Sequence, residues 1–224
     1  MGEPARAADP VHARGNYARS KAAAELLALE ADGRGMRVTA VRPHIVWGPG
    51  DTQLVERIVD RAAKGRLPLL DHGAALIDTT YVDNAAEAVV RALERIEWAH
   101  GRALVVTNGQ PRTVGELVAG FCRAAGVEPP TRRVSGVLAR LAGTVIEKVW
   151  ALRPGADEPP MTAFLAEQMS TAHWFEQQST REVLDWTPSV TVEEGMARLA
   201  EYYRTHPLGA HDAPMPATGS TAAR

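Results

Sequence analysis

The segment Met36-Arg37-Val38-Thr39-Ala40-Val41 is a short apolar run of the kind that forms a strand buried on both faces, as in a parallel sheet covered by helices. An alanine-rich segment, 13–31, precedes it and reads as a helix that ends at Asp32-Gly33-Arg34-Gly35, where glycines suit a helix C-terminus. A helix that leads directly into a buried strand indicates the α/β class. Arg42-Pro43 then leaves the strand, and ligands of such proteins usually bind at strand ends.

Helices and strands continue to alternate as far as about residue 126. We expect helices over 53–64, 82–98 and 113–125, and extended segments over 67–70, 75–81 and 102–107. Asp83 is expected to cap its helix, and Glu116 stands at capping-box spacing from Thr113. Beyond Pro129-Pro130 the pattern becomes helical and irregular, with helices expected over 134–150, 161–169, 180–184 and 192–203.

Composition narrows the classes of function. The chain has 224 residues, 45% of them hydrophobic, a formal charge of −2 and an isoelectric point near 6.4, so we expect no nucleic-acid partner. No run approaches the ~18 apolar residues of a membrane span, and we expect a cytoplasmic location. The single cysteine, Cys122, reads as a buried thiol rather than a nucleophile, and no Cys/His cluster predicts a metal site.

Tyr17 and Lys21 stand four residues apart in the first predicted helix, so their side chains leave the helix on one face. An ammonium beside a phenol favours the phenolate and brings the phenol's pKa from about 10 toward the working pH. A tyrosine in that setting is suited to acid–base catalysis. A Tyr-x-x-x-Lys match also arises by accident. The catalytic interpretation therefore depends on the order of the motifs that follow it.

That order consists of the stretch 16–25, then Arg42-Pro43-His44-Ile45-Val46-Trp47-Gly48-Pro49-Gly50-Asp51, then Asp78-Thr79-Thr80-Tyr81-Val82-Asp83-Asn84. It resembles the extended short-chain dehydrogenases/reductases of the NAD-dependent epimerase/dehydratase superfamily, specifically the 3β-hydroxysteroid dehydrogenase-like branch, from about residue 14 to 203. The resemblance implies an α/β fold, the C-terminal part of a doubly wound NAD(P)-binding Rossmann domain plus a smaller, mostly helical substrate region. The expected parts are residues 1–128, 129–205 and a disordered tail, 206–224, rich in small residues and proline.

The resemblance also implies the roles of individual residues. Tyr17 would exchange a proton with the substrate, and Lys21 would contact the nicotinamide ribose of NAD or NADP. Pro43, His44, Ile45 and Val46 would line the nicotinamide pocket.

Several of these residues have plainer readings. His44 can be an ordinary loop histidine, and residues 48–50 can simply shape a turn before a helix capped by Asp51. Apolar residues between 137 and 150 can line a substrate pocket or pack in the core.

Two departures from the family set limits on the function. Residues 1–16 contain no Ser or Thr to polarise a substrate oxygen, and the chain has no Gly-x-x-Gly-x-x-Gly turn to approach a pyrophosphate. We therefore expect this chain to be the C-terminal portion of such an enzyme and to be inactive alone.

For the complete protein the first hypothesis is an NAD(P)-dependent oxidoreductase that interconverts a secondary alcohol and a ketone. The substrate would be a hydrophobic small molecule, such as a sterol or a long-chain β-hydroxy/β-keto acid. A nucleotide-sugar epimerase or dehydratase is the enzymatic alternative, and a non-catalytic binding or assembly fragment is the third reading. The resemblance implies homodimerisation through the Tyr17 helix and the next long helix.

Overall fold

Four short strand pairs form the β-structure of the computed structural model, which describes residues 8–13, 16–137, 172 and 174–208. Three pairs are parallel and one is antiparallel. The parallel pairs are β1 (Ala40–Pro43) with β6 (Ala103–Val106), β2 (Val46–Trp47) with β5 (Thr80–Tyr81), and β3 (Leu69–Leu70) with β8 (Arg133–Val134). The antiparallel pair is β4 (Leu76–Ile77) with β7 (Arg112–Thr113).

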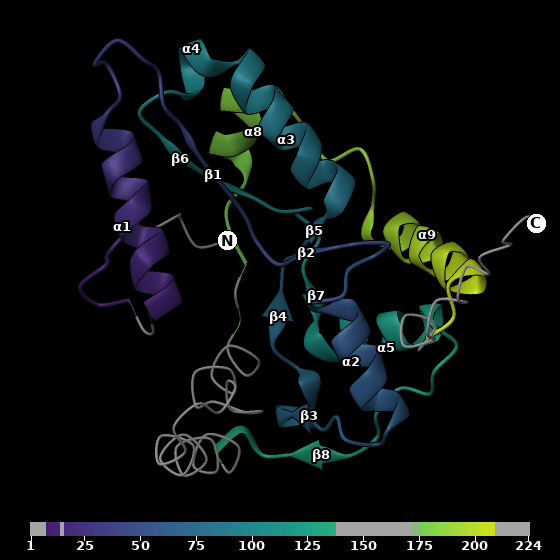
Figure 1. The fold of residues 1–224 in the computed structure, drawn as a ribbon. Coiled ribbons are helices and arrows are strands. Elements are labelled where there is room, and N and C mark those ends of the chain that lie inside the picture. The colour runs from purple at the N-terminus through teal and green to yellow at the C-terminus, as the bar shows by residue number, and fades with distance from the viewer. Residues whose placement is uncertain (1–7, 14–15, 138–171, 173, 209–224) are drawn as a thin grey trace, which may run out of the picture.

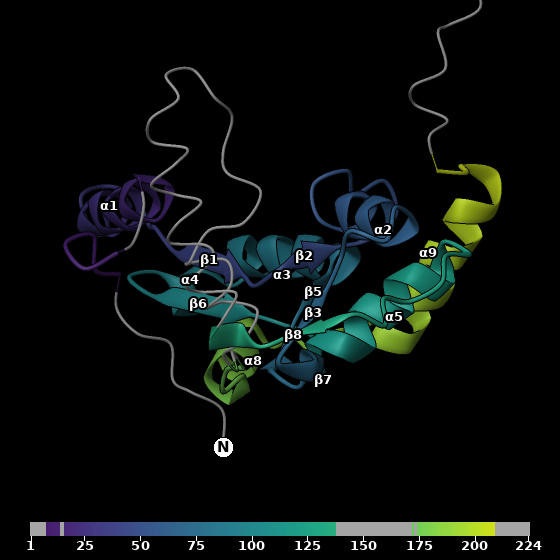
Figure 2. The same cartoon turned by 90° about the horizontal axis from the view of Figure 1, so that it is seen from below.

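Helices cover both faces of the β1–β6 pair. Figure 2 shows α1 and α3 on one side of these strands and α8 on the other, while α2, α5 and α9 gather at the far end of the molecule, as in Figure 1. The helical elements are α1 (Asn16–Glu30), α2 (Val55–Ala63), the 3-10 turn η1 (Asp71–Gly73), α3 (Val82–Glu94), α4 (Ile96–Ala99), α5 (Val114–Ala124), α8 (Gln178–Leu184) and α9 (Val192–Thr205). The expected α/β architecture is therefore present.

Strand β1 differs from its prediction in start and in burial. It begins at Ala40 rather than Met36, and all four of its residues are half-buried rather than buried on both faces. Hydrogen bonding to the segment before β6 starts earlier, because Val38 already accepts a hydrogen bond from the Gly101 N–H. Among the described residues only β6 pairs with β1, which explains the partial burial of the strand.

The expected single segment over 75–81 is divided into two strands. Leu76 and Ile77 pair antiparallel with β7, whereas Thr80 and Tyr81 pair parallel with β2. Asp78 and Thr79, between the two strands, are buried polar residues. A strand pattern read from one segment cannot show that its two ends pair with different partners, because the pattern reports burial and not pairing.

The buried apolar side chains form two hydrophobic clusters. In the first, Trp47 packs edge-to-face against Tyr81 and Phe121, at ring-centre distances of 5.3 and 5.2 Å. Cys122 is buried in the same cluster, where burial raises the pKa of its thiol, as expected for a structural cysteine. In the second cluster, small residues of α3 let β6 and the α8 side chains approach closely; its members are Ala88, Ala92, Ala99, Leu104, Val106, Leu184 and Trp186.

The hydrogen bonds at the first turns of the helices can be compared with the predicted capping residues. Thr113 and Glu116 form the predicted capping box at the start of α5. The Asp51 carboxylate accepts hydrogen bonds from the N–H groups of residues 53–55 just before and at the start of α2, although the N-cap position itself is Leu54. The prediction of Asp83 as a cap was wrong, because Asp83 lies inside the first turn of α3 and Tyr81 is the N-cap. The Asp83 carboxylate instead accepts a hydrogen bond from Arg198 of α9, at 2.8 Å.

Some predictions concern residues outside the described ranges. The helices expected over 161–169 and most of 134–150, and the tail from residue 209 onward, fall there. The predicted division into 1–128, 129–205 and 206–224 stays a prediction. In the described part, no helix is long and apolar enough to cross a membrane.

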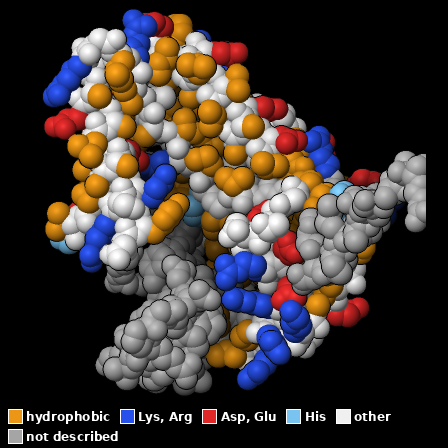
Figure 3. Space-filling view, viewed as in Figure 1, with side chains coloured by type: hydrophobic (Ala, Val, Ile, Leu, Met, Phe, Trp, Pro, Cys, Tyr) orange, Lys and Arg blue, Asp and Glu red, His pale blue; other side chains and the backbone are white. Residues whose placement is uncertain are grey.

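Apolar side chains also lie at the surface of α1 and α3. In α1 no residue is buried, and Leu26 and Leu27 are exposed. In α3 the outward residues Val89, Val90 and Leu93 are exposed as well. Figure 3 shows hydrophobic side chains gathered over this face. The homodimer implied by the resemblance remains a prediction.

Candidate functional site

The chain turns sharply where β1 ends. Pro43 closes the strand, and Ile45 has a φ of +47°, a left-handed conformation that is rare for a β-branched residue. Val46 then joins β5 in a different strand pair. Thr80 holds the turn, since its hydroxyl lies 2.8 Å from the His44 carbonyl oxygen and its N–H donates to the Ile45 carbonyl. Backbone strain of this kind, about 1–3 kcal/mol, is typical of binding sites.

His44 faces the loop between β4 and β5. Its Nδ1 lies 2.6 Å from the Asp78 carbonyl oxygen, which fixes Nδ1 as the donor. On another side the imidazole packs edge-to-face against Phe175, at 5.0 Å between ring centres. These contacts give the imidazole a defined position beside the carboxyl ends of β1 and β6.

Helix α1 runs antiparallel to β1, so its first turn points toward the end of the strand where His44 lies (Figure 1). The Glu25 carboxylate binds the Arg42 guanidinium and fixes the register of the helix on the strand. At 1.5 Å per helical residue, Lys21 lies about 6 Å and Tyr17 about 12 Å along the helix from Glu25, toward its first turn. The phenol is open to solvent, with 79% of Tyr17 exposed.

Four of the predicted site residues, Pro43, His44, Ile45 and Val46, form one continuous turn at the end of the β1–β6 pair. Tyr17 and Lys21 lie on α1, the helix that packs along β1. The predicted roles of all six residues remain predictions. No group of three or more His, Cys, Asp or Glu residues suited to a metal ion occurs in the described part of the chain.

A cleft of about 410 Å³ opens beside the same turn. It lies between the loop after β6 and the segment leading into α8, and Phe175 connects it to His44. Its lining residues are Asp78, Gly109, Pro111, Trp174, Phe175, Glu176, Gln177, Gln178, Arg181 and Glu182. Apart from Asp78, which belonged to a quoted motif, sequence reasoning identified none of them.

Asp78 is the buried acid of this cleft, with 1% of its surface exposed. Burial raises the pKa of its carboxyl, although hydrogen bonds from the Thr107 hydroxyl, at 2.7 Å, and from the Gln110 N–H, at 3.2 Å, oppose the effect. These two donors tie the loop after β6 to the β4–β5 loop that carries His44's partner. Asp78 therefore supports the shape of the cleft.

The raised pKa of Asp78 predicts how stability changes with pH. Because the folded pKa lies above the ordinary value of 3.8, the unfolded chain releases this proton first as pH rises. The contribution of Asp78 to the free energy of unfolding is therefore present below pH 3.8 and is lost as pH rises through the raised folded pKa. Asp78→Asn is expected to remove this decline, as measured by urea unfolding from pH 4 to 7. An identical slope in the exposed-site control Asp60→Asn and in Asp78→Asn would contradict it.

A second buried polar cluster supports the loop after β6. The Asn84 side chain donates to the Asn108 Oδ1 at 2.9 Å and to the Val190 carbonyl at 2.8 Å, and it accepts from the Ser189 and Val190 N–H groups at 3.0 Å each. Asn108 in turn accepts from the Tyr81 N–H. This cluster fixes where β6 ends and the cleft begins.

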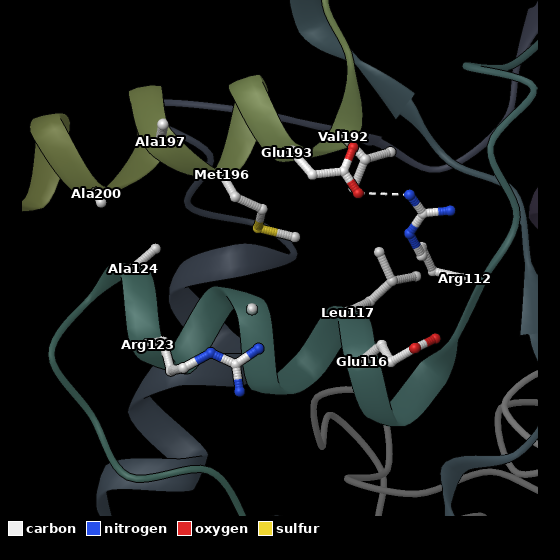
Figure 4. A pocket seen from close by; sticks show the side chains of 11 residues that line it. Arg112, Glu116, Leu117, Arg123, Ala124, Val192, Glu193, Met196, Ala197 and Ala200 are labelled. Carbon is white, nitrogen blue, oxygen red and sulfur yellow. Dashed lines mark hydrogen bonds and ion pairs between the residues drawn. The ribbon is translucent and has the colours of Figure 1, made fainter.

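A groove of about 530 Å³ lies elsewhere, between α5 and α9 (Figure 4). Leu117 and Met196 form its apolar floor, and the Arg112–Glu193 ion pair closes one end. The predicted site residues line neither space, but Phe175 of the other cleft packs against His44, so the cleft beside His44 is the better candidate site.

Comparison with known proteins identifies the relatives of the chain. Residues 2–107, which contain α1, β1 and the turn after it, match the model of the NAD dependent epimerase/dehydratase family. The match covers just under half of the chain and assigns residues 2–107 to this family. A 2-alkyl-3-oxoalkanoate reductase of Stenotrophomonas maltophilia is 40% identical over 186 residues, which are 82% of this chain and 56% of the relative.

A more distant relative and a solved structure extend the comparison. A 3β-hydroxysteroid-dehydrogenase/decarboxylase of Arabidopsis thaliana is 28% identical and matches 84% of this chain and 45% of its own length. The dTDP-glucose 4,6-dehydratase of Bacillus anthracis, solved in complex with NAD, has a TM-score of 0.61 at 18% identity, covering 90% of this chain and 56% of its own. The fold is thus Rossmann-like, and the two named sequence relatives are oxidoreductases. The chain spans about half the length of the curated relatives it matches.

Proposed function

We propose that the complete protein is an NAD(P)-dependent oxidoreductase that interconverts a ketone and a secondary alcohol, with a 3-oxo acid of the 2-alkyl-3-oxoalkanoate type as its substrate. The observation that carries the proposal is the 40% identity to a 2-alkyl-3-oxoalkanoate reductase, together with a strained turn at the end of β1, the strand along which the Tyr17-bearing helix packs. The apolar wall of the cleft, with Trp174, Phe175 and Pro111, suits an alkyl chain.

The described residues fit one part of the cofactor. The turn from Pro43 to Val46 offers backbone groups and a packed imidazole at the carboxyl ends of parallel strands, where nicotinamide rings bind in this class of fold. Lys21 lies on the helix that runs beside this turn. For the pyrophosphate, the sequence holds no Gly-x-x-Gly-x-x-Gly turn. We therefore propose that this chain alone holds only the nicotinamide end and is inactive.

In the proposed reaction, bound nicotinamide supplies or accepts the hydride. Tyr17 donates its phenolic proton to the carbonyl oxygen during reduction, and the Lys21 ammonium, one turn away, stabilises the phenolate that remains. The aromatic side chains Trp174 and Phe175 reduce access of water to the ketone. His44, held through Nδ1, orients the turn against which the ring packs.

An activity assay on the native protein tests the proposal. Protein isolated from its own cells, with its intact mass recorded, is expected to consume NADH or NADPH when a 2-alkyl-3-oxodecanoate is added. The 224-residue chain expressed alone is expected to consume neither. Turnover of a nucleotide sugar in place of the oxo acid would favour the epimerase or dehydratase alternative. Loss of both activities in the native protein would favour a non-catalytic role.

A further inference from the structure

Arg181 of α8 stands apart from the other charged residues of the cleft. Its Nε is buried without a hydrogen-bond partner, and its guanidinium forms no ion pair or hydrogen bond with the described residues. The guanidinium lies directly against Gly109, where an added methyl group would collide with it. A donor nitrogen taken out of water without a partner is costly, so the buried Nε of this half-buried side chain calls for a ligand in the cleft.

The acids of the cleft are all engaged by other donors. Asp78 accepts from Thr107 and Gln110. The other two acids, Glu176 and Glu182, both accept hydrogen bonds from Gln178. Its backbone N–H donates to Glu176, and its side-chain amide donates to Glu182 at 2.9 Å. Arg181 is therefore the one charged side chain lining this cleft that the described residues leave without a partner.

We infer that Arg181 binds the carboxylate of an organic acid in this cleft, an inference that rests on the proposed function and names how its substrate is held. The planar guanidinium presents paired N–H donors that match a carboxylate in two parallel hydrogen bonds. Trp174, Phe175 and Pro111 line the same space and receive an apolar chain. The 410 Å³ volume is within the range of small-molecule sites.

The surrounding acids select a carboxylate over a phosphate. Glu176 and Glu182 lie on the same cleft as Arg181, and their negative charge repels a dianion more strongly than a monoanion. Phe175 contacts both the cleft and His44, so a bound acid lies next to the predicted nicotinamide turn. Arg181 is thus a specificity-determining residue for acid over neutral substrates.

Equilibrium binding without cofactor tests this role. Isothermal titration of the native protein with 3-hydroxydecanoate and with its methyl ester is expected to show about ten- to hundredfold tighter binding of the acid. Arg181→Gln is expected to abolish the difference, and Arg181→Lys to restore part of it. Arg123→Gln, an exposed arginine on α5 outside this cleft, is the matched control and is expected to keep the difference.

Each outcome decides the inference. Equal affinities of acid and ester, or an unchanged difference in Arg181→Gln, would overturn it. Arg181-dependent binding of inorganic phosphate in preference to the acid would overturn the carboxylate assignment. Because no turnover is measured, a failed reductase assay leaves this result intact. Conversely, reduction of neutral ketones and oxo acids at equal rates would keep the oxidoreductase function and reject the subsite.

Discussion

Replacement of Tyr17 by phenylalanine in the complete protein is expected to lower the turnover number by about 10²- to 10⁴-fold, the usual contribution of a positioned general acid. The substitution removes only the phenolic oxygen. Tyr17 is 79% exposed and lies on a helix with no buried residue, so the substitution is not expected to change the stability of the fold. The Michaelis constant is expected to change little, because the proton is transferred in the transition state and contributes little to ground-state binding.

Steady-state kinetics of NAD(P)H consumption with the oxo acid measure this effect. Tyr202→Phe is the matched control, because Tyr202 is another helical tyrosine, in α9, and packs against His206 away from the cleft. It is expected to retain full turnover. A Tyr17→Phe protein with wild-type turnover would reject the catalytic role of the Tyr17–Lys21 pair.

Replacement of Asn84 by alanine is expected to lower the free energy of unfolding by about 3–5 kcal/mol, the range of large single-site effects. Asn84 is fully buried, and its side chain makes four hydrogen bonds of 3.0 Å or less to Asn108, Ser189 and Val190. Alanine leaves those donors and acceptors buried without partners. A chain of this length loses about 2–4 °C of melting temperature per kcal/mol, so a shift of about 10 °C is expected.

Thermal and urea unfolding of the two proteins give this difference directly. Gln53→Ala removes another side-chain amide, but at an exposed position before α2, and is expected to change stability by less than about 0.5 kcal/mol. Similar melting temperatures for Asn84→Ala and Gln53→Ala would show that the buried cluster does not stabilise the fold.

Local pattern predicted most of the elements of the first 126 residues. The 13–31 helix, the 102–107 strand and the capping box at Thr113 each depend on neighbours in sequence, and α1, β6 and α5 confirm them. The main error in predicting the strands concerns which strands pair with each other. The segment 75–81 divides because its ends pair with β7 and β2, which no local signal reveals.

The site was partly predictable for the same reason. The turn at Pro43 and the Tyr17–Lys21 pair are motifs of adjacent residues, so sequence alone identified them. Arg181 was missed because its position against Gly109 joins residues 72 positions apart, and a lone arginine in an amphipathic helix reads as a surface residue.

The distance along the chain between Asn84 and Val190 also determines when the buried polar cluster can form during protein synthesis. These partners are 106 residues apart, so at about 5–20 residues per second a ribosome needs about 5–20 s to deliver the second after the first. During that interval the start of α3 has emerged without the groups that satisfy Asn84. The nascent chain therefore stays open at this point until Val190 has been translated, and chaperones have access to it throughout that interval.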